Sequence, residues 1–117
     1  MTDPMALKER TLRQLLEIRE TLLSVDCQEM IDQKPQEMQR EYCQIISQAQ
    51  INYLKLQRAS LEELSKEMLT VENELLESMK SMQESIDDLS RLEKFMTDAT
   101  GFIRLVQRIV SILPLTI

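Results

Sequence analysis

The sequence predicts an all-α protein, an elongated helical bundle with coiled-coil-like packing around a long central helix. The 117 residues hold one glycine and three prolines, too few for the many turns of a sheet protein. From 35 to 97 the chain has no glycine and no second proline, and apolar residues recur at steps of three and four, the spacing of one helical face. This length is typical of one domain, so 1–117 is expected to be a single helical domain.

A first helix is expected at about residues 4–24. Asp3 can accept a hydrogen bond from a free backbone amide of the first turn. Pro4 suits that turn because its missing N–H would have no helical partner there. Leucines at helical spacing follow and give this helix its apolar stripe.

The segment 25–34 is expected to connect the first helix to the long one. Asp26 and Glu29 have the spacing of a capping box, which favours a short helix within the connection. Lys34 precedes a proline and is therefore pushed out of the helical region. Pro35 then opens the long segment.

The segment 35–97 reads either as one rod or as a helical hairpin broken near residue 60, where Ser60 and Glu63 again have capping-box spacing. An unbroken helix would be about 93 Å long at ~1.5 Å per residue. The first helix could not cover so long a stripe, so another chain would have to bury the rest, and a dimer or higher oligomer is expected. The predicted interaction stripe consists of Leu64, Met68, Val71, Leu75, Met79, Met82 and Ile86.

A short apolar helix is expected at 102–113, because Gly101 can take the positive φ that ends a helix. Apolar residues cover most of its circumference, so it needs an apolar partner. It can pack into a bundle of its own chain or of a partner, or lie in a membrane interface with its arginines on anionic headgroups. Spanning is disfavoured, because 102–117 is shorter than the ~20 apolar residues that a bilayer requires. The predicted docking or anchor residues are Phe102, Leu105, Val106, Ile109 and Leu113, with Arg104 and Arg108.

The charge argues against nucleic-acid binding. Twenty acids face 14 bases, giving a net charge of −6, whereas proteins that neutralise phosphates present surplus Lys and Arg. Residues 61–100 carry 11 acids and 4 bases, giving −7, while 101–117 carry two arginines and no acid. Arg104 and Arg108 could therefore pair with acids of the preceding segment.

The residues for common catalytic chemistry are missing. With no histidine, there is no Ser-His or Cys-His arrangement and no common general base. Cys27 and Cys43 form no CxxC motif, so a zinc site is not expected. Two reduced thiols, which suit a cytoplasmic protein, are favoured over a disulfide between two helices. A loose cation site could form from Glu84, Asp87, Asp88 and Glu93, but a solvated acidic face is favoured.

These patterns indicate a non-catalytic helical interaction or scaffold protein, with no enzyme activity, cofactor or metal. It is expected to act through oligomerisation, or through helix–helix association with a helical partner protein. The alternative is a peripheral membrane protein, in which 102–113 anchors a helical rod to an anionic membrane. The corresponding locations are the cytoplasm and the cytoplasmic membrane surface.

Overall fold

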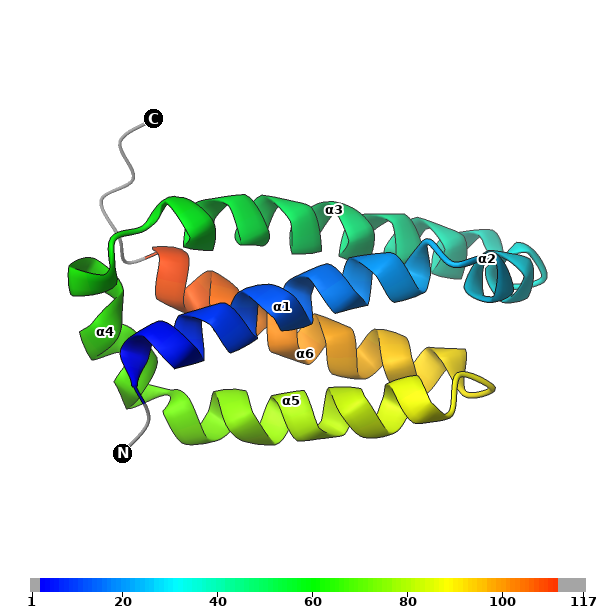
Figure 1. Cartoon of the computed structure of the whole chain (residues 1–117). Helices are drawn as coiled ribbons and strands as arrows, with labels where there is room; N and C mark the ends of the chain where they lie inside the picture. Colours follow the sequence, from blue (N-terminus) through cyan, green and yellow to red (C-terminus); the bar gives the residue numbers. More distant parts are fainter. Residues whose placement is uncertain (1–2, 112–117) are drawn as a thin grey trace.

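A computed structural model describes residues 3–111, and these residues form six helices and no strand. The all-α prediction is therefore confirmed. Four long helices lie side by side, and two short ones join them at opposite ends of the bundle (Figure 1). The long helices are α1 (Pro4–Leu22), α3 (Gln36–Arg58), α5 (Glu72–Asp87) and α6 (Leu92–Ser111); the short ones are α2 (Val25–Asp32) and α4 (Leu61–Thr70).

The chain runs up and down through the bundle, so that α3 and α6 point the same way (Figure 1). The hairpin of α1 and α3 packs on the hairpin of α5 and α6, and α3 lies beside α6. The molecule measures 45 × 31 × 18 Å, about half the length expected for an unbroken rod.

The prediction of one continuous long helix is wrong. The segment 35–97 is divided among α3, α4, α5 and the start of α6. The predicted break near residue 60 is present. Ala59 is extended, and Ser60 Oγ accepts a hydrogen bond from the amide of Glu63 at 3.2 Å. Two further breaks lie at Val71 and at 88–91, where no glycine or proline marks the sequence.

The end predicted at Gly101 is wrong, because α6 continues through it to Ser111. No residue of 3–111 has a positive φ. Phe95, Ala99, Phe102 and Val106 all lie on the buried face of α6, and burying this face outweighs the low helix propensity of one glycine. Residues 102–111 thus belong to a longer helix, while 112 and 113 lie outside the described residues.

The connection 25–34 contains the expected short helix, but with a different cap. Ser24 Oγ, rather than Asp26, accepts the hydrogen bond from the amide of Cys27, at 3.4 Å. The first helix consequently ends at Leu22 instead of residue 24. The cap at Asp3 is confirmed, since its carboxylate accepts from the amide of Met5 at 3.1 Å.

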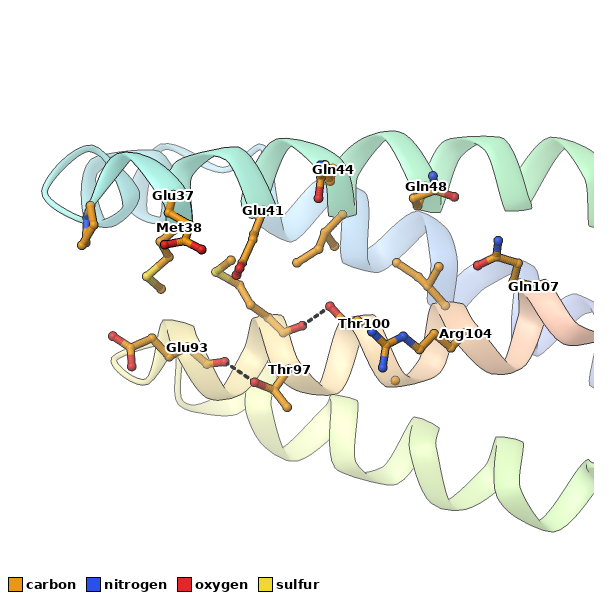
Figure 2. Close-up of a pocket in the computed structure, with 15 residues that line it drawn as sticks. Glu37, Met38, Glu41, Gln44, Gln48, Glu93, Thr97, Thr100, Arg104 and Gln107 are labelled. Carbon is orange, nitrogen blue, oxygen red and sulfur yellow. Dashed lines mark hydrogen bonds between the residues drawn. The ribbon is translucent and has the colours of Figure 1, made fainter.

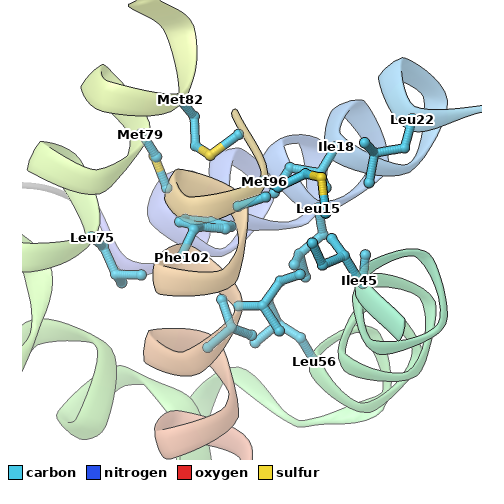
Figure 3. Packing of buried hydrophobic residues seen from close by; sticks show 14 of the residues in the cluster. Leu15, Ile18, Leu22, Ile45, Leu56, Leu75, Met79, Met82, Met96 and Phe102 are labelled. Carbon is cyan, nitrogen blue, oxygen red and sulfur yellow. The ribbon is translucent and has the colours of Figure 1, made fainter. Parts of the chain in front are cut away.

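One hydrophobic core fills the space between the four long helices. Figure 3 shows residues of all four meeting there, among them Leu15, Ile45, Leu75, Met82 and Phe102. Each fully buried side chain of this size contributes roughly 1.5–3 kcal/mol. The short helices α2 and α4 add Cys27, Ile31, Leu64 and Met68 at the two ends.

Candidate interaction surface

The predicted interaction stripe lies inside the bundle of a single chain. Ile86 is half-buried against the core, and the other six members are buried: Leu64, Met68, Val71, Leu75, Met79 and Met82. The chain therefore covers this stripe with its own helices, and a second chain is not needed to bury it.

The predicted C-terminal docking residues also face the core, as far as the structure describes them. Phe102, Val106 and Ile109 are buried, and Leu105 is half-buried. Membrane anchoring through this segment would require these side chains to leave the core. Leu113 lies outside the described residues.

The two arginines of α6 are exposed. Arg108 Nη1 lies 3.7 Å from Glu74 Oε2, so α6 pairs with an acid of α5, as the uneven charge distribution predicts. No helix among the described residues is both long and apolar enough to cross a membrane.

The acidic residues do not gather into a metal site in the described part of the chain. No group of three or more carboxylate, thiol or imidazole ligands approaches closely enough there to hold an ion, and this includes Glu84, Asp87, Asp88 and Glu93. Cys27 is buried, Cys43 is exposed, and both are free thiols.

A groove with a volume of about 1050 Å³ runs between the parallel helices α3 and α6 (Figure 2). Its lining includes the apolar residues Met38, Ile45, Met96 and Ile103, of which the last three are buried. Uncharged polar side chains line its middle: Gln44, Gln48, Thr97 and Thr100. Both threonine hydroxyls donate to backbone carbonyls of their own helix, so these two hydroxyls are already engaged within α6.

The charges in the groove are separated along its length. Glu37, Glu41 and Glu93 lie where the two helices begin, and Arg104 lies further along α6. Lys34 Nζ approaches Glu93 Oε1 at 3.4 Å. The acidic and basic residues of the groove therefore lie at different levels of the bundle.

The exposed face of α3 beside this groove carries no charge over a long stretch. Residues 42–54 contain no Asp, Glu, Lys or Arg, although these types make up 29% of the chain. Ile51 and Leu54 are 44% and 39% exposed on this face. We call this surface the α3 ridge, and its exposed residues are Cys43, Gln44, Ser47, Gln48, Gln50, Ile51 and Leu54.

Most of the large apolar side chains that are exposed in the described residues belong to the first half of the chain. Of the seven such side chains within residues 3–111, six belong to α1, α2, α3 or the residue after α1, and the seventh, Leu69, lies on α4. Lys8 Nζ donates to the carbonyl of Ala59 at 2.8 Å, which places the start of α1 against the end of α3. Sequence reasoning missed this surface because it followed the longest apolar stripe, yet the uncharged run 42–54 is visible in the sequence.

Comparisons of the chain with protein-family models, with curated protein sequences and with solved structures find no match.

Proposed function

We propose that this chain is a non-catalytic helical interaction protein, which acts by helix–helix association with another protein chain. One observation carries the proposal: the α3 ridge is exposed, uncharged and partly apolar in an otherwise strongly charged protein. The cores of protein–protein interfaces are depleted in charged residues in the same way.

The closed bundle gives this surface a rigid base. Tyr42, Ile45, Ala49 and Leu56 hold the opposite face of α3 in the core. The ridge can therefore meet a partner without unfolding of the bundle, and little conformational entropy is lost on binding.

Site-specific photocrosslinking tests this function. A photoreactive amino acid replaces Ile51 on the ridge, and the matched control replaces Leu69, which is 39% exposed on α4. In extract of the cells that naturally express the protein, we expect protein adducts from position 51 and few from position 69. Equal labelling at both positions, or none at either, contradicts the proposed function.

A further inference from the structure

We propose that the partner of the α3 ridge is a second copy of this chain, packed antiparallel about a two-fold axis level with Ser47. This inference rests on the proposed function and specifies its partner. In such a dimer, the ridge of each copy lies in the groove between α3 and α6 of the other.

The absence of charge on the ridge favours self-association. A two-fold contact brings identical surfaces together, so any charge near the axis would meet its own like. With a net charge of −6, two copies repel one another over most orientations. The run 42–54 avoids this repulsion, and its midpoint lies next to Ser47.

The charges at the two ends of α3 are complementary in the antiparallel arrangement. The first half of the helix carries Glu37, Arg40 and Glu41, a net charge of −1, and the last turn carries Lys55 and Arg58, a net charge of +2. A two-fold axis at Ser47 places Lys55 of one copy level with the interval between Glu37 and Glu41 of the other. A parallel arrangement would instead place like charges at the same level.

The side of α3 that faces the groove has the same order of charges, with two glutamates near its start and Lys55 near its end. Glu37, Glu41, Gln44, Gln48, Ile51 and Lys55 occur at steps of four and three, so they share one side of the helix. Four of them line the groove.

On the α6 side of the groove there is room for another helix to approach. Gly101 is exposed there, and a Cβ placed on it would meet no atom within 4 Å. Its conformation requires no glycine either, because no described residue has a positive φ. A glycine at this point leaves room for a helix of another copy to pack closely against α6.

The contact is expected to be reversible. An interface that is two helices wide and runs along the α3 ridge would bury on the order of 1,000 Å² in total, near the lower limit for specific interfaces. We therefore expect a dissociation constant in the micromolar range for the full chain, measured by sedimentation equilibrium.

Charge exchange between positions 41 and 55 tests the arrangement. Lys55→Glu should weaken the dimer about tenfold, because two favourable pairs become like-charge pairs. Glu41→Lys should weaken it similarly. The double variant should recover dimerisation to within about threefold of the unmodified chain. These positions are about 21 Å apart along one helix at ~1.5 Å per residue, so recovery cannot arise from pairing within one chain.

The outcomes separate this inference from the proposed function. Weakening by each single substitution with recovery in the double variant supports the antiparallel dimer. A chain that stays monomeric, or a dimer indifferent to these substitutions, overturns it. If position 51 still crosslinks to a different protein, the proposed function stands without the dimer; if it crosslinks to nothing, both fail. Circular dichroism of each variant checks that the helices remain folded.

Discussion

At the scale of single residues, Tyr42 joins two helices through its hydroxyl. The side chain is buried, and the hydroxyl donates a hydrogen bond to the carbonyl of Leu22, the last residue of α1. Burial is the main reason that the pKa of Tyr42 rises from 10.0 to about 12, with smaller contributions from Cys27, Cys43 and Asp32. The neutral phenol is thus the form that the fold requires.

Tyr42 therefore makes stability depend on alkaline pH. Between pH 10 and about 12 the unfolded phenol loses its proton while the folded one keeps it, so the unfolded state binds fewer protons and the free energy of unfolding falls as pH rises. The contribution is fully present below pH 10 and is lost at about 1.4 kcal/mol per pH unit above it. Urea unfolding should show a steeper decline for the unmodified chain than for Tyr42→Phe. Equal slopes would contradict this role.

A polar cluster around the buried Ser85 connects α5 to α6. Ser85 Oγ donates to the carboxylate of Asp98, and Lys94 Nζ lies 3.2 Å from Ser85 Oγ and 3.0 Å from Asp98 Oδ2. Ser85→Ala should lower the free energy of unfolding by about 1 kcal/mol, because Asp98 loses a donor. Ser81→Ala, at a half-buried position of the same helix, is the control. Equal effects of the two substitutions in chemical denaturation would show that the cluster adds nothing.

At the scale of helices, the starts of α1 and α4 were predictable, whereas those of α5 and α6 and the breaks before them were not. Asp3 with Pro4, and Ser60 with Glu63, are local signals that tertiary packing leaves intact. The break at Val71 was hidden because the steps of the apolar stripe continue across it. Residues 64, 68, 71, 75 and 79 all face the same core although the helix changes direction.

The cap at Ser60 fixes where the chain turns from α3 into α4. Ser60→Ala removes the acceptor for the amide of Glu63 and should cost about 1 kcal/mol of stability. Ser60→Asp, which keeps an acceptor, should restore most of the loss. If both variants unfold at the same denaturant concentration as the unmodified chain, this cap does not stabilise the turn.

Gly101 should be replaceable with a gain in stability. It lies inside α6, has no positive φ, and leaves open space where a Cβ would stand. Gly101→Ala should therefore raise the free energy of unfolding by about 1 kcal/mol, the difference in helix propensity between the two residues. Thermal or urea unfolding of the monomeric chain measures it, and a loss of stability would contradict this expectation.

At the scale of the whole molecule, a single chain buries the long apolar stripe that was expected to need a second chain. The long apolar stripe and the apolar side chains of 102–110 are both packed in one bundle. Composition and pattern predicted helices, a core and, as one of the open alternatives, packing of the C-terminal apolar segment into a bundle of its own chain. The path of the chain was not predicted, because it depends on the turns at Val71 and 88–91. The α3 ridge was missed because the longest apolar stripe was expected to be the interaction surface, although the uncharged run 42–54 is visible in the sequence.

The most direct test of a closed bundle that associates through α3 is the solution mass of the intact chain over a series of concentrations. We expect light scattering to rise from the mass of one chain, 13.7 kDa, towards twice that value and no further, because a two-fold contact closes on itself. Ile51→Glu should remain at the mass of one chain, and Leu69→Glu, changed at a similarly exposed position on α4, should behave like the unmodified protein. A mass of one chain at every concentration, or growth beyond two chains, would contradict the α3 dimer.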